Sequence, residues 1–290
     1  MPKIIEVHKY HGYGNDFLIV WDGQVQSDEH SEFSRSICRR HWGVGADGCV
    51  FLAPLQSNRF LYRIYNQDGS HAGFSGNGGR CACAFLHHHE LADREEIILD
   101  TPSGDKRFRL LEGEAPAWTY RSWLGEPGFA PDSIPFRPPS EEPAGLQRIV
   151  DYPLSVGDRT IRVTALSMGN PQCLLLVEKL PSEGEFRRLG AMLERHPAFP
   201  DRTNVGFVLV EGRQRLRLRI WERGVGPTQS SGTGSAASAV AAIINGKADS
   251  PVEVHTESGH QQVEWSPGAP LVLTGQCRYV ARIDYCWKPG

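Results

Sequence analysis

Short hydrophobic runs separated by polar and glycine-rich segments recur along this chain. Eight of the runs are rich in β-branched, aromatic and leucine side chains and have the length of β-strands. They cover residues 17–21, 49–52, 60–65, 97–99, 161–165, 173–177, 205–210 and 216–221. Helical patterns are fewer and lie near residues 31–41, 78–92, 184–196 and 233–247. The pattern predicts an α+β fold in which helices pack against mostly antiparallel strands.

A proline-rich stretch, residues 126–143, interrupts this pattern near the middle of the chain. Proline ends helices and cannot donate a hydrogen bond inside a sheet. The stretch therefore predicts a connector between two bodies of similar size.

Three short motifs of the first half recur in the second half at a nearly constant spacing. Gly14-Asn15 returns as Gly169-Asn170, 155 positions later. The sequence RIYN at 63–66 returns as RIWE at 219–222, and SGNG at 75–78 returns as SGTG at 231–234, both 156 positions later. Collinear matches of this kind predict two equivalent halves related by pseudo-symmetry.

Each copy of the last motif opens an alanine-rich helix, so Ser75 and Ser231 stand at strand-to-helix turns. Backbone N–H groups at a helix N-terminus are suited to bind a carboxylate or another anion. Pseudo-symmetry would place the two turns opposite one another across a cleft. Each motif alone could be an ordinary serine N-cap followed by a flexible turn. The duplication favours the functional interpretation.

Composition narrows the classes of partner. The 290 residues carry 31 basic and 34 acidic side chains, a net charge of −3, and no long block of either sign. This balance predicts no binding of nucleic acid or of an anionic membrane surface. No apolar run approaches the roughly 18 residues that span a bilayer, and the N-terminus lacks a signal-peptide pattern. We therefore expect a cytoplasmic protein.

Cysteine and histidine give no metal-site pattern. The seven cysteines form no CxxC pair, and this odd set fits reduced, mostly buried thiols better than disulfides or a zinc site. The run His87-His88-His89 lacks ligand spacing, and we interpret it as a solvated helix face. No metal is expected.

Seven sequence blocks carry a resemblance to a known family. They are HGYGNDF (11–17), GVGADG (43–48), RIYNQDGS (63–70), SGNGGRC (75–81), MGNPQC (168–173), TNVGF (203–207) and WERGVGPTQSSGTGSAAS (221–238). In this order they resemble the diaminopimelate epimerases, over about residues 8–275. The resemblance implies two pseudo-symmetric α+β domains, each a β-barrel-like sheet around a central helix. It implies an N-terminal domain of residues 1–122 plus 278–290, a C-terminal domain of residues 123–277, and a homodimer.

The resemblance also implies a chemistry. That family epimerises the α-carbon of a small amino-acid substrate without pyridoxal phosphate, metal or other cofactor, and uses one cysteine from each half. Here the two cysteine positions are Ser75 and Ser231. A hydroxyl is far less acidic than a thiol and needs an adjacent base to react. Gln172, Gly48 and Pro227 also depart from the family's histidine, glutamine and acidic residue. These further changes favour natural divergence over two engineered substitutions.

The amino-acid recognition set of the family is retained. The expected catalytic residues are Ser75, Ser231 and Glu222, with Glu222 as the best replacement base and Asp68 and His71 as weaker candidates. The expected substrate-binding residues are Asn15, Asn66, Gly76, Asn77, Asn170, Asn204, Arg223, Gly232 and Thr233. Arg223 would pair with a distal carboxylate, and the N–H groups of the two helix N-termini would hold the α-carboxylate. Each asparagine alone could instead be a turn former.

The residues leave three functions open. The first is a pyridoxal phosphate-independent isomerase that acts at the α-carbon of an amino-acid-like substrate and has diverged from two-thiol racemisation, as a one-base isomerase, cyclase or eliminase. The second is a diaminopimelate epimerase that carries Cys→Ser substitutions. The third is an inactive amino-acid-binding paralogue. We favour the first, because one carboxylate base and one acid suffice for a one-base reaction.

Overall fold

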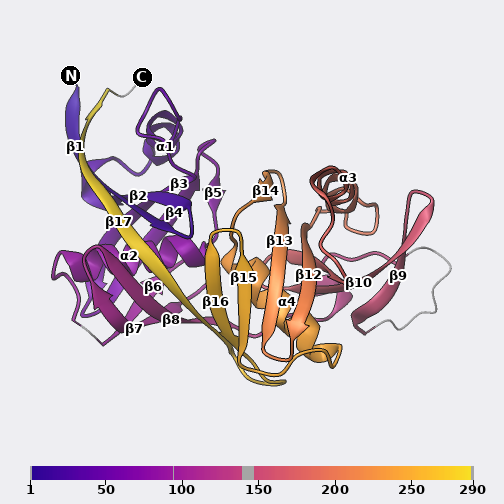
Figure 1. Cartoon of the computed structure of the whole chain (residues 1–290). Helices are drawn as coiled ribbons and strands as arrows, with labels where there is room; N and C mark the ends of the chain where they lie inside the picture. Colours follow the sequence, from indigo (N-terminus) through magenta and orange to yellow (C-terminus); the bar gives the residue numbers. More distant parts are fainter. Residues whose placement is uncertain (1, 94, 139–146, 289–290) are drawn as a thin grey trace. The chain divides into compact units, whose positions relative to one another are not determined.

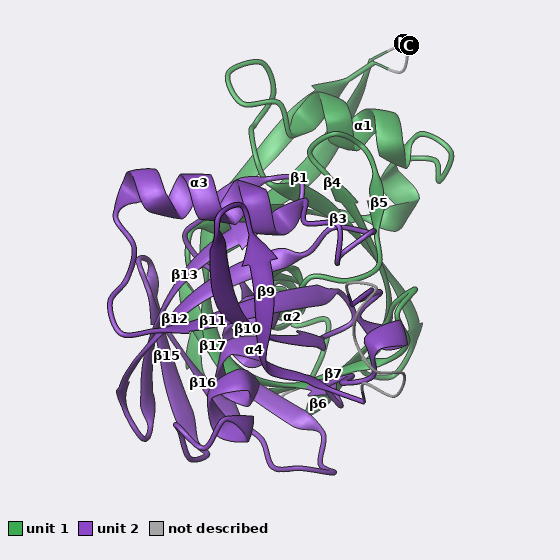
Figure 2. Ribbon diagram, turned by 90° about the vertical axis from the view of Figure 1, so that its right-hand side faces the viewer, with its two compact units in different colours: residues 1–123, 274–290 green, residues 124–273 purple. Residues whose placement is uncertain are grey.

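The computed structural model of the chain describes residues 2–93, 95–138 and 147–288. Among these residues the fold is α+β, with β-strands predominating and four α-helices (Figure 1). The chain divides into two compact units (Figure 2). Unit 1 is made of residues 1–123 and 274–290, and unit 2 of residues 124–273.

Unit 1 is a closed barrel of β-strands around helix α2. In the described residues the strands pair in the order β1, β2, β3, β4, β6, β7, β8 and β17, and β17 pairs back with β1 to close the ring. The strands are β1 (Lys3–Gly12), β2 (Asn15–Trp21), β3 (Gly48–Gln56), β4 (Arg59–Asn66), β6 (Glu96–Asp100), β7 (Lys106–Glu114), β8 (Ala117–Gly125) and β17 (Leu271–Trp287). Helix α1 (His30–Ile37), α2 (Gly76–His88), the 3-10 turn η1 (Asp22–Gln24) and the short strand β5 (His71–Ala72) complete the unit.

The pattern of buried and exposed side chains explains why the strands of unit 1 enclose α2. Strand β4 alternates buried and half-buried positions, so one face of the strand meets the core. Helix α2 is buried over residues 76–86, which agrees with its place inside the ring (Figure 1). One hydrophobic cluster surrounds α2, and a second fills the space between the sheet and α1.

Unit 2 repeats the plan around helix α4. Its strands pair in the order β9, β10, β11, β12, β13, β15 and β16. The strands are β9 (Ile149–Val156), β10 (Arg159–Ser167), β11 (Pro171–Val177), β12 (Asn204–Gly212), β13 (Arg215–Glu222), β14 (Gly226–Thr228), β15 (Val252–Thr256) and β16 (Gly259–Glu264). The helices are α3 (Glu183–Glu194), α4 (Gly232–Ile244) and the 3-10 turn η2 (Pro131–Ser133). Alanine side chains let α4 pack closely against the strands.

The bounds of five elements in unit 1 recur in unit 2 displaced by 156 positions. The pairs are β2 and β11, β3 and β12, β4 and β13, α2 and α4, and β6 and β15. Gly14 and Gly169, which precede β2 and β11, also share a positive φ, at 82° and 83°. The internal duplication predicted from three motifs is therefore confirmed at the level of whole elements.

All four predicted helices and all eight predicted strands are present, with shifted ends. Helix α1 stops at Ile37, because the chain turns there and reaches a positive φ of 72° at His41. The polarity pattern missed strands such as β7, in which most positions are exposed. The proline-rich stretch is more than a connector, since Ile134 and Phe136 are buried in unit 2, while residues 139–143 lie outside the described part.

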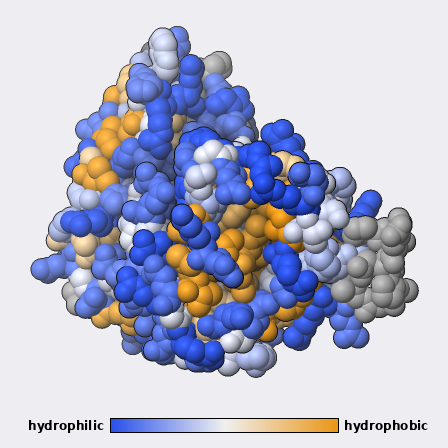
Figure 3. Space-filling view, turned by 45° about the vertical axis from the view of Figure 1, so that its right-hand side comes forward, coloured by the Kyte–Doolittle hydropathy of each residue, from blue (hydrophilic) through white to orange (hydrophobic). Residues whose placement is uncertain are grey.

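Hydropathy of the surface was inspected for areas that could bind a partner. Figure 3 shows a face that is largely hydrophilic, with hydrophobic residues gathered in limited areas between hydrophilic ones. Large exposed hydrophobic side chains include Trp42 and Val225. No helix in the described part of the chain is both long enough and apolar enough to cross a membrane.

Candidate active site

The two predicted serines occupy the same structural position in their respective units. Ser75 is the N-cap of α2, with φ −132° and ψ 126°, and its Oγ accepts a hydrogen bond of 3.1 Å from the Gly78 N–H. Ser231 is the N-cap of α4, with φ −145° and ψ 128°, and its Oγ accepts a hydrogen bond of 3.2 Å from the Gly234 N–H. The capping interpretation is therefore correct for both. It leaves the hydrogen of each hydroxyl available for donation.

The glycines of these motifs have different physical roles. A Cβ at Gly78 would lie 2.7 Å from the Tyr62 hydroxyl, and one at Gly234 would lie 2.8 Å from Cδ1 of Ile220. Both glycines therefore allow a helix to approach a strand closely. A Cβ at Gly76 would meet nothing within 4 Å, although Gly76 is buried. The first residue of α2 thus borders open space.

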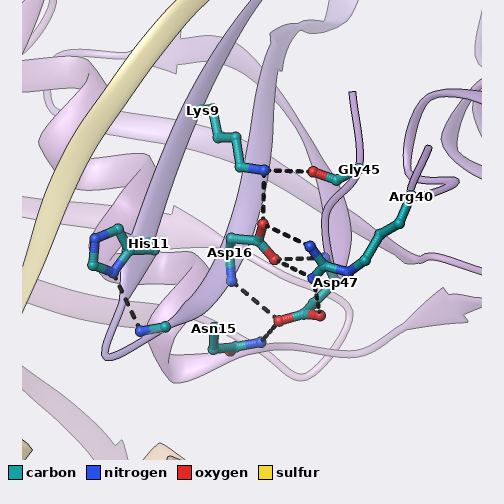
Figure 4. A network of polar contacts seen from close by, with 8 residues as sticks. Lys9, His11, Asn15, Asp16, Arg40, Gly45 and Asp47 are labelled. Carbon is teal, nitrogen blue, oxygen red and sulfur yellow. Dashed lines mark hydrogen bonds and ion pairs between the residues drawn. The ribbon is translucent and has the colours of Figure 1, made fainter. Parts of the chain in front are cut away.

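A charged network supports the site residues of unit 1. Asn15 Nδ2 donates a hydrogen bond of 2.7 Å to Asp47 Oδ2, and Asn77 Nδ2 donates one of 3.1 Å to Asn15 Oδ1. Arg40 Nη2 lies 2.9 Å from a carboxylate oxygen of Asp47 and 2.9 Å from one of Asp16 (Figure 4). The two predicted asparagines are therefore in contact and are held through Asp47.

Asp16 ties this network to strand β1. Lys9 Nζ lies 2.8 Å from Asp16 Oδ2 (Figure 4). Burial acts to raise the pKa of Asp16, but hydrogen bonds and charge from Lys9 and Arg40 outweigh it and lower that pKa. Asp16 is therefore held as a carboxylate, and it positions Arg40.

The corresponding residues of unit 2 form an uncharged network. Gln172 Nε2 donates hydrogen bonds of 2.8 Å to Asn170 Oδ1 and 3.3 Å to Thr233 Oγ1. Thr233 Oγ1 lies 3.5 Å from Ser231 Oγ, a long contact. Because the amide of Gln172 occupies Thr233 as an acceptor, the threonine hydroxyl can donate towards Ser231. Ser231 Oγ accepts from the Gly234 N–H, and its own hydrogen can point either to Thr233 Oγ1 or away from it.

Glu222 and Arg223 lie at the end of β13 and the start of the turn to β14. The Arg223 N–H donates a hydrogen bond of 2.8 Å to Asn204 Oδ1, and Arg223 Nη1 donates one of 3.0 Å to the Asp201 carbonyl. Glu222 is half-buried, and its backbone pairs with Gly226. Arg223 is exposed, so further guanidinium N–H groups remain available to a carboxylate.

Glu194, which the sequence did not single out, holds this turn. It is 2% exposed and accepts hydrogen bonds of 2.8 Å from Trp221 Nε1 and 2.9 Å from the Gly224 N–H. Burial acts to raise the pKa of Glu194, but these two hydrogen bonds and the charges of Arg195 and Arg202 lower it overall. The carboxylate thus fixes both sides of the Glu222–Arg223 segment.

Three predicted residues of unit 1, Asn66, Asp68 and His71, lie at the end of β4, in the turn that follows it and at the start of β5. Asn66 is exposed, and its amide donates a hydrogen bond of 2.9 Å to Ser70 Oγ. Asp68 accepts hydrogen bonds from the N–H and hydroxyl of Ser70, which lower the pKa of Asp68. His71 is exposed and its ring lies near Tyr65. No contact recorded among the described residues joins these three to Asn15 or Asn77.

None of the cysteines is at either helix N-terminus. Six are buried, and Cys286 on β17 is exposed. Burial raises the pKa of the Cys38 thiol to about 12 and the pKa of Cys49, Cys81, Cys83 and Cys173 as well. A buried thiol with a raised pKa is a poor base near neutral pH.

The histidine run is only partly the solvated face that the sequence predicted, because His89 alone of the three is exposed. His87 and His88 are half-buried, and their rings form hydrogen bonds with Tyr120 and Tyr10. These two histidines line a cavity of about 420 Å³ at the C-terminal end of α2 that includes none of the predicted site residues. In the described part of the chain, no three His, Cys, Asp or Glu side chains are placed to hold a metal ion.

The structure therefore joins Asn15 with Asn77, Asn170 with Thr233 and Ser231, and Asn204 with Arg223. The supporting residues Asp47, Arg40 and Glu194 were missed. Asp47 lies within the GVGADG block, so its place in that block was the available signal. Nothing in the local sequence around Glu194 indicates that its carboxylate would be buried against Trp221.

A family model, curated relatives and solved structures were compared with this chain, and they agree on its family and fold. The family model for diaminopimelate epimerase matches residues 7–121 and 164–280. A diaminopimelate epimerase of Pelotomaculum thermopropionicum is 36% identical over 97% of this chain and 98% of its own length. One of Desulforudis audaxviator is 39% identical over 95% of this chain and 97% of its own. A hydroxyproline epimerase structure from Agrobacterium vitis shares the fold, with a TM-score of 0.69 at 16% identity, and covers 98% of this chain and 92% of that one.

Proposed function

The chain belongs to the diaminopimelate epimerase family and is an isomerase of the racemase and epimerase class, and we propose that it moves the Cα proton of an amino-acid-like substrate without a thiol pair and without pyridoxal phosphate. The observation that supports this proposal is that Ser75 and Ser231 are the N-caps of α2 and α4. The resemblance implies that these are the two positions at which the family carries its thiols. The homodimer and the cytoplasmic location stay predictions.

The serines are suited to donate hydrogen bonds rather than to abstract a proton. Each Oγ accepts from a backbone N–H of its own helix, and Ser231 also has the Thr233 hydroxyl beside it. Neither hydroxyl has a recorded contact with a basic group among the described residues, and a serine needs such a group to lose its proton. We assign both serines to stabilise negative charge that develops on the substrate carboxylate.

We assign the proton abstraction to Glu222. A carboxylate is an established general base, and a one-base reaction needs no second thiol. Glu222 is the last residue of β13 and lies beside Arg223, whose backbone N–H donates to Asn204. This arrangement supports a substrate with a second carboxylate, which the exposed guanidinium of Arg223 would bind in a bidentate manner.

The test is exchange of the Cα proton in D2O, followed by NMR and mass spectrometry over a panel of amino acids that includes LL- and meso-diaminopimelate. We expect exchange for at least one compound that carries a second carboxylate. Glu222→Gln should lower the exchange rate about 10²- to 10⁴-fold, the usual cost of losing a general base. Glu178→Gln, which removes an exposed carboxylate after β11, is the control and should exchange normally.

A double variant separates the alternatives. If the wild type does not exchange but Ser75→Cys with Ser231→Cys does, the chain is a disabled two-thiol epimerase and the proposal is wrong. If neither protein exchanges while a panel compound raises the melting temperature, the chain is an amino-acid-binding paralogue. Exchange that is unaffected by Glu222→Gln would keep the isomerase but remove Glu222 as its base.

A further inference from the structure

Arg80 is a buried cation whose charge the structure leaves without an anionic partner. It lies in the first half of α2 and is 0% exposed. Its Nη2 donates to Asn77 Oδ1, and its guanidinium lies 6.0 Å from the centre of the Tyr13 ring. Among the described residues, no atom accepts a hydrogen bond from its Nε or Nη1, and the partner of its Nη2 is the neutral amide of Asn77. Burial of a charge without an anionic partner lowers the free energy of unfolding, so we expect this arrangement to serve a function.

Two glycines leave room for this arrangement. A Cβ at Gly275 would lie 3.1 Å from the guanidinium carbon of Arg80, and one at Gly12 would lie 3.1 Å from Asn77 Oδ1. Neither glycine has a positive φ, so neither is required by backbone conformation. Their lack of a side chain instead lets β17 and β1 pack directly against Arg80 and Asn77.

The guanidinium of Arg80 and the carboxylate of Asp47 fix the orientation of the two side-chain amides that lie between them, those of Asn77 and Asn15. Arg80 can only donate, so Asn77 presents its oxygen to Arg80 and its nitrogen to Asn15. Asp47 can only accept, so Asn15 presents its nitrogen to Asp47 and its oxygen to Asn77 (Figure 4 shows Asn15 and Asp47). Both amide oxygens are occupied, and each amide nitrogen keeps one further N–H. This end of α2 therefore offers donors and favours a ligand group that accepts.

Helix α4 lacks this charge. The position equivalent to Arg80, 156 residues later, is Ala236, and the position equivalent to Asn77 is Thr233. The neighbours of Thr233 are the neutral Gln172 and Ser231. A helix N-terminus carries about half a positive charge in both units, but only in unit 1 does a full buried charge add to it. The two helix ends are alike in backbone and unlike in electrostatics.

We propose that Arg80 is a positioning residue for the reaction: acting through Asn77 and Asn15, it makes the N-terminal end of α2 selective for the anionic α-carboxylate of the substrate. The identity of the substrate group rests on the proposed function. The orientation of the amides and the positive charge rest on unit 1 alone. Because Arg80 is buried, added salt screens its effect only weakly.

The experiment compares two probes, L-glutamate and L-isoglutamine, which differ only in an α-carboxylate or an α-carboxamide. Calorimetry should show that the wild type binds L-glutamate at least about tenfold more tightly, since one hydrogen-bonded charge is at stake. Arg80→Met should reduce this ratio at least about threefold, and Arg80→Lys should restore part of it. The control Arg107→Met removes an exposed charge from β7 of the same unit and should keep the wild-type ratio.

The ratio of the affinities for L-glutamate and L-isoglutamine distinguishes a positioning role of Arg80 from a purely structural one. If Arg80→Met weakens both probes equally, or if the wild type shows no preference for the acid, the inference is wrong. If Arg80→Met does not fold, Asn77→Asp gives the same test, because the new carboxylate would neutralise Arg80 and should also lower the ratio. Cα exchange is measured on the same proteins. If Arg80→Met lowers the affinity ratio but no panel compound exchanges its Cα proton, only the proposed function is wrong. If a compound exchanges but Arg80→Met leaves the affinity ratio unchanged, only this inference is wrong.

Discussion

The substitution Glu194→Gln tests whether a buried carboxylate holds the turn that carries Glu222 and Arg223. Glu194 is 2% exposed and each of its oxygens accepts one N–H, from Trp221 and from Gly224. Glutamine keeps the volume but replaces one oxygen by an NH2 group, which would face a donor. The loss of one charge-assisted hydrogen bond and the unpaired N–H should together cost about 2 kcal/mol of unfolding free energy.

Such a loss is measurable by thermal unfolding. For a chain of this size about 2 kcal/mol should lower the melting temperature by roughly 4–8 °C at pH 7. The matched control is Glu185→Gln in the same helix, where the carboxylate is 42% exposed and its pair with Arg159 is 3.5 Å long. An exposed pair of this kind should contribute less than about 1 kcal/mol. Circular dichroism of the three proteins gives the comparison.

The effect should depend on pH in a defined direction. The pKa of Glu194 is lower in the folded chain than its usual value, so the folded state binds this proton less readily than the unfolded state. Its stabilisation is therefore present above the unfolded pKa of about 4.3 and is lost as the pH falls through the folded pKa. The gap between wild type and Glu194→Gln should close towards acid. Equal melting temperatures at pH 7, or a gap that stays constant down to pH 3, would refute the reasoning.

Three further predictions concern other parts of the chain. Arg40→Met should shift acid unfolding to higher pH, because the lowered pKa of Asp16 then rises and its stabilisation disappears earlier as the pH falls; an unchanged acid midpoint would contradict this. Gly190→Ala should cost about 1–3 kcal/mol, since its Cβ would lie 2.8 Å from the Trp221 ring, whereas Gly184→Ala in the same helix meets nothing within 4 Å and should be neutral or stabilising in a chemical denaturation series. Finally, a thiol reagent should modify Cys286 rapidly in the folded protein and the six buried cysteines only on unfolding, and a second fast thiol would count against the thiol-free site.

The sequence by itself determined the local elements and the duplication. Strands such as β4 were predictable because the alternation of buried and half-buried positions is a property of neighbouring residues. The two helix N-termini were predictable because serine followed by glycine is a local capping signal. The spacing of 156 between repeated motifs then applied to whole elements, including α2 and α4.

Only the tertiary structure decided which groups meet. The contact of Asn15 with Asp47 depends on the parallel pairing of β2 and β3, and that of Glu194 with Trp221 on the packing of α3 against β13. The closure of the unit 1 ring joins Lys3 to Trp287, at opposite ends of the chain. Partners so distant are chosen by topology and burial, not by local propensity. The sequence repeat aligns Arg80 with Ala236, but only the tertiary structure shows that the Arg80 side chain is fully buried.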